Sequence, residues 1–230
     1  MTENEFIHAL EELNIKYDEN KLNQLKRYYE LLIEWNEKIN LTSITKKEDV
    51  YLKHFYDSLT LVKIMNLNHI STFADVGTGA GFPGIVIKIF FPLLHITLID
   101  SLNKRTDFLN LVIKELNLKD VEVITSRAED YKKRENFDLV TARAVANLHV
   151  ILELLTPLSK KYVILMKGDA TIELENTDYL YKELDIKLTE KEEFLLPIEN
   201  SKRTLLKYEK LKETNKKYPR NYGQIKKKPL

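Results

Sequence analysis

The sequence predicts an α/β protein with a mostly parallel sheet, an antiparallel last strand and a helical N-terminal extension. Up to about residue 66, apolar residues recur at helical spacing between charged ones. From Ser71 onward, short apolar runs alternate with longer helical stretches, which is typical of a parallel sheet with crossover helices. A glycine-rich loop at residues 75–84 joins the first apolar run to the helical stretch that follows it. We therefore expect the functional site at the carboxyl edge of the sheet.

The N-terminal segment is predicted to contain three helices. A short pattern covers residues 6–13, and a longer one covers residues 18–39, where leucine, isoleucine and tyrosine recur every three or four positions. A third helical pattern covers residues 46–65. The expected organisation has three parts: residues 1–66 as helices packed on the core, residues 67–212 as the α/β domain, and residues 213–230 as a basic tail.

The rest of the chain is predicted to alternate strands and helices. Short apolar runs predict parallel strands at residues 72–76, 96–100, 121–125, 138–142 and 162–166. Helical patterns lie at residues 84–90, 104–116, 145–158 and 172–184. Two further runs, at residues 187–196 and 204–211, flank a polar turn. A hairpin of this kind at the end of a parallel sheet fits an antiparallel edge strand.

Composition excludes several classes of protein. The chain has 230 residues, of which 43% are hydrophobic and 31% charged, as expected for a folded globular protein. It has no cysteine and its five histidines lie far apart, so neither a disulfide framework nor a metal site is expected. The N-terminus does not resemble a signal peptide, and every apolar run is too short to span a bilayer. We expect a cytoplasmic monomer without a membrane or metal partner.

Positive charge is concentrated at the end of the chain. The net charge of the whole protein is only +1, so attraction of a nucleic acid must come from a local patch. Residues 210–230 contain eight lysines and arginines against Glu213 alone. Tyr218 and Tyr222 lie among these charges, which suits electrostatic binding with some base stacking. The alternative is a tail that only increases solubility.

The clearest motif is the loop that runs from Asp75 through Gly77, Gly79 and Gly81 to Gly84. It follows the first predicted strand and opens the first helix of the sheet. Glycines allow a sharp turn and a close approach of the backbone to a ligand. The spacing of the last three glycines also satisfies the dinucleotide fingerprint, so the loop alone leaves the nucleotide-like cofactor open.

Acidic residues around the loop favour one cofactor. Asp75 ends the first strand, Asp100 ends the second, and Glu129 and Asp130 follow the third. All these positions lie on the carboxyl edge of a parallel sheet, where several carboxylates would repel a pyrophosphate. S-adenosylmethionine instead offers two cationic groups, ribose hydroxyls and an adenine amino group to carboxylates. The alternative is that the aspartates only cap helices or turns and that Glu129 and Asp130 lie in a solvated loop.

Several separated blocks resemble one family, the ribosomal RNA small-subunit methyltransferase G family, also called glucose-inhibited division protein B. They are residues 75–84 (DVGTGAGFPG), 98–105 (LIDSLNKR), 126–129 (SRAE), 141–144 (TARA), 35–42 (WNEKINLT), 54–58 (HFYDS), 218–220 (YPR) and 227–230 (KKPL). The resemblance implies a Rossmann-like class I methyltransferase fold. It also implies S-adenosyl-L-methionine as cofactor, S-adenosyl-L-homocysteine as product, and 16S ribosomal RNA or the small subunit as partner. The implied reaction methylates N7 of a guanine, of the guanine-527 type, in the decoding region.

The resemblance also assigns the cofactor-binding residues. They belong to the loop, to the ends of the second and third strands, and to the end of the fourth strand. The resemblance gives Gly77, Phe82, Asp100, Ser101, Leu102, Ala128, Glu129 and Arg143, and the glycine loop itself adds Asp75, Gly79 and Gly81 to the expected set. Within it, residues 100–102 would flank the ribose, Ala128 and Glu129 would face the adenine, and Arg143 would lie beside both the cofactor and the target.

Methyl transfer to guanine N7 needs no general base, because N7 already carries a lone pair. Catalysis would then consist mostly of positioning, with Arg143 as the expected catalytic residue, holding O6 or a phosphate. Expected contacts to RNA, each with a solvated-surface alternative, are Lys104, Arg105, Lys167, Arg203 and Arg220. His54 is given no chemical role. A dinucleotide-dependent oxidoreductase and a non-catalytic RNA-binding protein stay open as rival interpretations.

Overall fold

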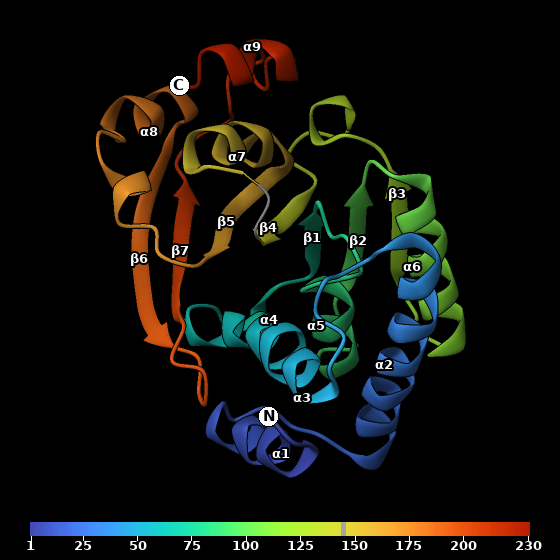
Figure 1. The fold of residues 1–230 in the computed structure, drawn as a ribbon. Coiled ribbons are helices and arrows are strands. Elements are labelled where there is room, and N and C mark those ends of the chain that lie inside the picture. The colour runs from blue at the N-terminus through green and yellow to red at the C-terminus, as the bar shows by residue number, and fades with distance from the viewer. Residues whose placement is uncertain (144–145) are drawn as a thin grey trace.

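The computed structural model describes residues 1–143 and 146–230, and shows a seven-stranded sheet with helices on both faces (Figure 1). The strand order is β3-β2-β1-β4-β5-β7-β6. Strands β1 to β5 are parallel and β7 pairs antiparallel with β5. The strands are β1 Thr72–Val76, β2 His95–Asp100, β3 Val121–Thr125, β4 Phe137–Arg143, β5 Ser159–Lys167, β6 Ile186–Leu195 and β7 Lys202–Lys210. The predicted α/β sheet with an antiparallel last strand is confirmed.

The terminal hairpin places its second strand inside the sheet. β7 lies between β5 and β6, with Leu206 opposite Leu165 on one side and Lys191 on the other. Leu205 and Leu206 on β7 are both buried, whereas β6 alternates between exposed and partly exposed residues after its first position. The edge strand on this side of the sheet is therefore β6, and β7 is an interior strand.

Two helices cover each face of the sheet. On one face α5 (Gly84–Phe90) and α6 (Asn103–Glu115) pack with the N-terminal helices, and on the other lie α7 (Leu148–Leu155) and α8 (Asp178–Leu184). Successive residues of β5 point to opposite faces of the sheet, because Ile164 belongs to the first core cluster and Leu165 to the second.

Two of the predicted helices are shorter than expected. The prediction for residues 145–158 began at Val145, which lies outside the described residues; α7 is followed by a 3₁₀ turn, Thr156–Leu158. Pro157 lies in that turn and cannot continue an α-helix. The prediction of one helix at 172–184 was wrong. Asn176 has φ of +56° and separates a 3₁₀ turn, Ile172–Leu174, from α8.

The N-terminal helices pack on the α5–α6 face. Helix α1 (Glu3–Glu12) begins with a capping box in which Thr2 and Glu5 bond reciprocally, and Asp18 caps α2 (Glu19–Ile39). Tyr28 of α2 is fully buried, and its hydroxyl donates to the main-chain oxygen of Ala80 in the glycine loop. The N-terminal segment thus supports the loop directly.

The third N-terminal helix is not regular. Residues 46–65 form α3 (Lys47–Val50), a π-helical turn (Tyr51–Tyr56), α4 (Asp57–Leu59) and a 3₁₀ turn (Thr60–Lys63). A π-helical turn changes the direction in which side chains project and often lies at a functional site. Here His54 lies within that turn and Asp57 directly follows it, and both line the cleft described below.

The C-terminal residues fold against the core. Thr214, Tyr218 and Ile225 are buried, and α9 (Tyr222–Lys227) lies over α7 in Figure 1. The first core cluster joins N-terminal residues to sheet residues without a break, so the three-part division at residues 66 and 212 stays a prediction. In the described part of the chain, no helix combines the length and apolar character that crossing a bilayer requires.

Candidate active site

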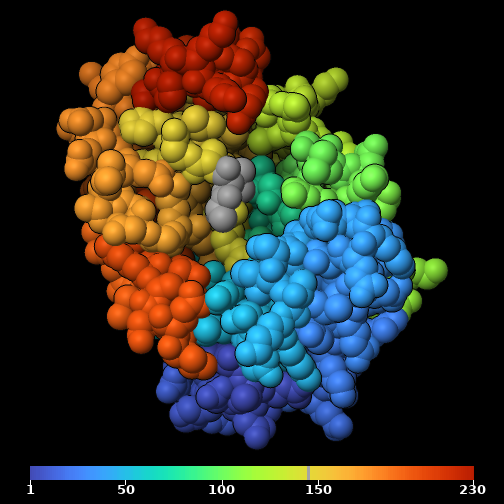
Figure 2. Space-filling model, viewed as in Figure 1, coloured from blue at the N-terminus to red at the C-terminus, as the bar shows by residue number. Residues whose placement is uncertain are grey.

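A cleft of about 1040 Å³ opens at the carboxyl ends of β1 to β5. In Figure 2 the teal glycine-loop region is recessed between the green β2–β3 region and the yellow α7 region. Of the expected cofactor-binding residues, the cleft is lined by Gly77, Gly79, Phe82, Asp100, Ser101, Ala128, Glu129 and Arg143. The carboxyl ends of parallel strands meet at one sheet edge, which brings these distant residues together.

The glycine loop adopts backbone angles that favour glycine. Gly79 has φ of +61° and Gly81 φ of +103°. A Cβ atom placed on Gly79 would meet no atom within 4 Å, so this side of the loop faces open space in the cleft. A Cβ on Gly81 would lie 2.6 Å from both Ile85 Cγ1 and the Tyr28 hydroxyl, so Gly81 is required for packing and does not line the cleft.

Asp75 was predicted to bind the cofactor, but it does not line the cleft. It is fully buried behind the loop, where its Oδ2 accepts hydrogen bonds from Thr78 Oγ1 at 2.6 Å and from the Gly84 amide at 2.8 Å. Burial raises the pKa of Asp75 to about 6, against the lowering effect of these two hydrogen bonds. The position of Asp75 therefore supports a role in shaping the glycine loop, and we leave it out of the proposed cofactor contacts.

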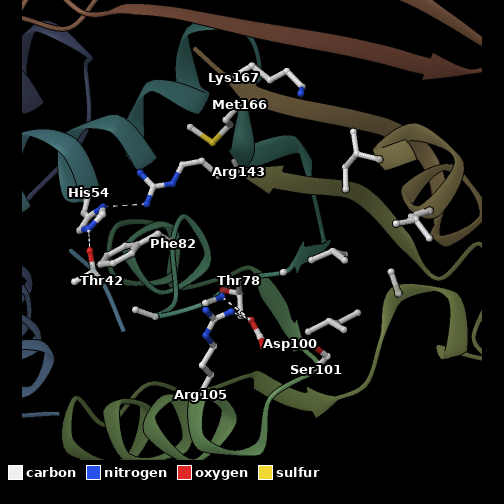
Figure 3. A pocket seen from close by; sticks show the side chains of 18 of the residues that line it. Thr42, His54, Thr78, Phe82, Asp100, Ser101, Arg105, Arg143, Met166 and Lys167 are labelled. Carbon is white, nitrogen blue, oxygen red and sulfur yellow. Dashed lines mark hydrogen bonds and ion pairs between the residues drawn. The ribbon is translucent and has the colours of Figure 1, made fainter. Parts of the chain in front are cut away.

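Asp100 ends β2 at the floor of the cleft (Figure 3). Its carboxylate accepts from the amides of Gly79 at 2.9 Å and Leu102 at 3.1 Å, and lies 3.4 Å from Arg105 Nη1. These contacts fix the carboxylate between the glycine loop and the start of α6. Ser101 lines the cleft, whereas Leu102 is half exposed and does not.

The end of the cleft beside β3 is a largely apolar slot. Ile99, Ala128, Ile151 and Leu154 line it, and Glu129 adds a carboxylate whose side chain is mostly buried. A concave, mostly apolar lining with a few polar groups is typical of sites that bind small molecules and cofactors.

The opposite end of the cleft is aromatic and cationic. The rings of His54 and Phe82 stack at 4.3 Å between centroids, and the Arg143 guanidinium carbon lies 5.3 Å from the Phe82 ring centroid. Phe82 thus packs against both residues, as Figure 3 shows.

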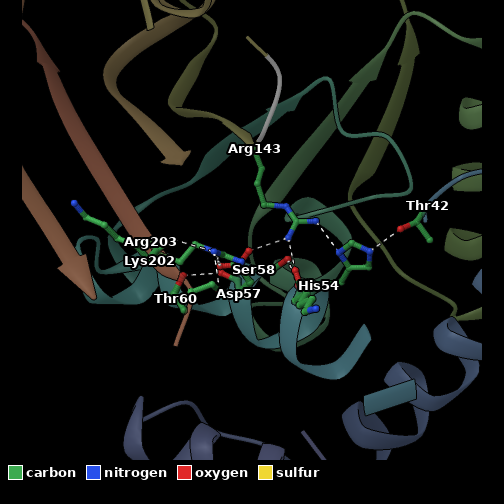
Figure 4. Close-up of polar contacts among 10 residues, drawn as sticks. Thr42, His54, Asp57, Ser58, Thr60, Arg143, Lys202 and Arg203 are labelled. Atoms are coloured by element: carbon green, nitrogen blue, oxygen red, sulfur yellow. Dashed lines mark hydrogen bonds and ion pairs between the residues drawn. The ribbon is translucent and has the colours of Figure 1, made fainter. Parts of the chain in front are cut away.

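Three hydrogen bonds hold the Arg143 guanidinium (Figure 4). Nη1 donates to the main-chain oxygen of Lys53 at 2.8 Å and to Asp57 Oδ2 at 3.2 Å, and Nη2 donates to His54 Nδ1 at 3.1 Å. Arg203 Nε donates to the other Asp57 oxygen at 3.0 Å. A buried carboxylate is therefore shared by two arginines that both line the cleft.

His54 is a site residue for which no role was predicted from the sequence. Because Arg143 has only protons to donate, His54 Nδ1 accepts, and Nε2 then carries the proton toward Thr42 Oγ1 at 2.9 Å. Burial, reinforced by the Arg143 charge, lowers the pKa of His54 to about 3. The only sequence signal was its place in the block at residues 54–58, since helical spacing alone suggested ordinary packing.

The neutral form of His54 makes stability depend on pH. Its pKa is about 3 when folded and about 6.5 when unfolded, so its contribution is complete above about pH 6.5 and is lost as the pH falls toward 3. Between about pH 7.5 and pH 5 we expect the unfolding free energy of the wild type to fall by about 2 kcal/mol relative to His54→Asn. Urea unfolding of both proteins at both pH values measures this difference.

The comparison with His54→Asn is needed because Asp75 acts in the opposite sense. Its raised pKa of about 6 stabilises the fold as the pH falls through 6, and both proteins share this contribution. The asparagine amide oxygen can still accept from Arg143. A difference between the two proteins that stays constant with pH would show that His54 is not held neutral.

The basic residues expected to contact RNA lie in three different settings. Lys104 is exposed outside the cleft, whereas Arg105, Lys167 and Arg203 line it. Lys167 is paired with Glu173 at 2.7 Å. The Arg220 guanidinium binds Glu153, which is fully buried, through Nε at 2.8 Å. Arg220 is therefore occupied within the protein, and we leave it out of the proposed RNA contacts.

Two solved structures with the same fold are named as methyltransferases. A SAM-dependent methyltransferase from Aquifex aeolicus superposes with a TM-score of 0.55 at 18% identity, over 74% of this chain and 96% of that one. Magnesium protoporphyrin IX methyltransferase from Synechocystis, solved with bound SAM, gives 0.58 at 10% identity, over 80% and 97%. At these identities the similarity confirms the predicted Rossmann-like class I methyltransferase fold.

Sequence relatives identify the family. The family model described as rRNA small subunit methyltransferase G matches residues 21–218. The chain belongs to this family. Proteins named ribosomal RNA small subunit methyltransferase G from Lysinibacillus sphaericus and Bacillus subtilis are 47% and 46% identical to it, over 100% and 98% of both chains. The predicted family and the predicted class of enzyme, a methyltransferase, are therefore confirmed. The region that matches the family model includes His54, Asp57 and Arg143.

Proposed function

We propose that this protein transfers a methyl group from S-adenosylmethionine to N7 of a guanine in 16S ribosomal RNA. The observation that carries the proposal is the cleft, which presents Asp100 and the open side of Gly79 on one side and the Arg143 guanidinium on the other. A cofactor and a nucleobase could meet between them. The enzyme class and the cofactor follow from the family, and N7 of guanine is the finer part of the proposal.

The residues of the cleft fit S-adenosylmethionine. Asp100 can accept from ribose hydroxyls, the open side of Gly79 admits close approach of the ligand, and the apolar slot beside Glu129 suits adenine with its amino group. Phe82 closes the end near Arg143. When bound there, the cofactor supplies an electrophilic methyl group on a sulfonium.

The chain's residues would act by positioning. When S-adenosylmethionine is bound, its methyl carbon would be available to the lone pair of guanine N7, with the electron pair of the carbon–sulfur bond leaving on sulfur. Arg143 donates to guanine O6 or to a phosphate, and leaves N7 free to attack. No proton moves in this step. Among the described residues that line the cleft, His54 is the only histidine, and Arg143 and Thr42 fix it, which is consistent with this mechanism.

Substrate RNA would approach the rim of this cleft. Arg105, Lys167 and Arg203 line it, and exposed Lys104 stands at the start of the helix that carries Arg105. We propose them as contacts to the phosphate backbone. We further propose that the protein acts as a cytoplasmic monomer on the small subunit or its RNA.

Calorimetric titration tests the cofactor. We expect the wild type to bind S-adenosylmethionine and not NAD, and Asp100→Ala to weaken binding by about tenfold to several hundredfold. Each hydrogen bond to a charged group contributes about 1.5–3 kcal/mol, and the carboxylate can accept from two ribose hydroxyls.

Asp100→Asn keeps one oxygen acceptor and should fall between Asp100→Ala and the wild type. Asp107→Asn, an exposed aspartate on the same helix as Arg105, is the matched control and should bind normally. Binding of NAD alone would favour the oxidoreductase, and RNA binding without cofactor binding would favour the non-catalytic RNA-binding protein.

A further inference from the structure

The C-terminal strap, residues 219–230, begins where the family match at residues 21–218 ends. It contains the short helix α9, shown in red above α7 in Figure 1. Its lysines would suggest a solvated tail, yet its conformation is defined by contacts with the core. The function of this folded segment is therefore a separate question.

Three contacts hold the strap in place. At its start, Arg220 donates to the fully buried Glu153 from its main-chain amide at 3.0 Å and from its guanidinium at 2.8 and 2.5 Å. In its middle, Ile225 is fully buried in a small cluster with residues of α7. At its end, the main-chain oxygen of Leu230 contacts His149 Nδ1. The strap is thus fixed along its whole length.

This fixation presents Tyr222 to the cleft. Tyr222 is 39% exposed and lines the same cleft as Ala128, Glu129 and Leu154, and Ile225 of the same helix packs with Leu154 and Ala128. The Arg127 guanidinium carbon lies 5.9 Å from the ring centroid, and Arg127 also approaches Glu129 at 3.7 Å. An exposed aromatic ring held beside an apolar slot is suited to stacking on a flat base.

We propose that Tyr222 is a cofactor-binding residue and that its ring forms the outer wall of the adenine slot. This inference rests on the proposed function, because it takes S-adenosylmethionine as the ligand. The strap then completes the pocket: Ile99, Ile151 and Leu154 form the inner apolar wall, and Tyr222 faces them from the rim. Arg127 steadies the ring from outside.

The rival occupant of the Tyr222 ring is a base of the RNA substrate. The position favours the cofactor, because Tyr222 lies beside Arg127, which approaches Glu129. Arg143 and Phe82 instead mark the end where the acceptor base is expected. A structural role is a third outcome, in which Tyr222 only completes the packing of α9.

Calorimetric titrations without RNA separate these outcomes. We expect Tyr222→Phe to bind S-adenosylmethionine within about twofold of the wild type, because stacking needs the ring and not the hydroxyl. Tyr222→Ala should bind about fivefold to a hundredfold more weakly, as expected when one stacking partner of a base is lost. The same loss should appear with S-adenosylhomocysteine and with methylthioadenosine, which share the adenosine group. Tyr179→Ala, at an exposed tyrosine on α8 that does not line the cleft, is the matched control.

Each outcome decides the inference. Unchanged cofactor binding by Tyr222→Ala, with an unfolding midpoint below that of the wild type, overturns it in favour of packing. Unchanged cofactor binding with weakened binding of 16S ribosomal RNA overturns it in favour of RNA stacking. Failure of the wild type itself to bind S-adenosylmethionine would instead remove the proposed function, which makes the two failures distinguishable.

Discussion

Replacing Asp57 with asparagine is expected to slow methyl transfer about a hundredfold, while the affinity for S-adenosylmethionine stays within about threefold. Methylation at N7 leaves a positive charge on the guanine, and a full guanidinium charge close by opposes this change. Asp57 offsets that charge through its 3.2 Å contact with Arg143. Without Asp57, the Arg143 charge about 6 Å from the guanine would raise the activation free energy by about 3 kcal/mol at an effective dielectric constant near 20. This corresponds to about a hundredfold in rate. Single-turnover transfer of labelled methyl groups to 16S RNA measures the effect.

A double-mutant cycle shows whether Asp57 acts through Arg143. Arg143→Ala alone should reduce transfer by about a hundredfold to a thousandfold, since the target base loses its positioning group. Arg203 still pairs with Asp57 in that variant, so the carboxylate is not left alone and the fold should persist. Adding Asp57→Asn to Arg143→Ala should then change little. Additive losses would mean that Asp57 has a separate role. Asp49→Asn, at a nearby exposed acid, is the control.

Local sequence was enough to predict that Gly79 and Asp100 lie at the same edge of the sheet. Gly79 lies in the loop that follows β1 and Asp100 ends β2, and parallel strands place the ends of both at one edge. Asp75 shows the limit of this reasoning. Its position at a strand end was predicted correctly, but its side chain turns back to bond Thr78 and Gly84, which strand position alone does not determine.

The end of the cleft at Arg143, where the acceptor base is expected, depends on tertiary contacts that a single sequence does not reveal. His54 and Asp57 reach Arg143 across 89 and 86 residues, because the N-terminal helices dock beside the glycine loop. A π-helical turn within residues 46–65 then alters which side chains face the cleft, and periodicity predicted a regular helix there. The charge composition of the C-terminus predicted an RNA contact at Arg220. In the structure Arg220 is instead bound by Glu153, 67 residues away in the sequence.

The Tyr28–Gly81 contact is where the N-terminal segment and the glycine loop depend on each other. Gly81→Ala is expected to lower the unfolding free energy by roughly 2–5 kcal/mol, from backbone strain at φ +103° and from overpacking against Tyr28 and Ile85 at 2.6 Å. Gly79→Ala is the matched control: its φ of +61° costs about 1–2 kcal/mol, and its Cβ meets no atom within 4 Å.

The two alanine variants should therefore separate stability from binding. Gly81→Ala should shift the urea midpoint to lower concentration without changing the slope of the transition. Gly79→Ala should keep most of its stability and lose cofactor affinity at least tenfold, since its new methyl group points into the space that a ligand would fill. Equal stability losses in both variants would contradict this division, because packing against α2 distinguishes Gly81 from Gly79. Two glycines of one loop are thus needed for different reasons, Gly81 for the stability of the fold and Gly79 for the binding of the ligand.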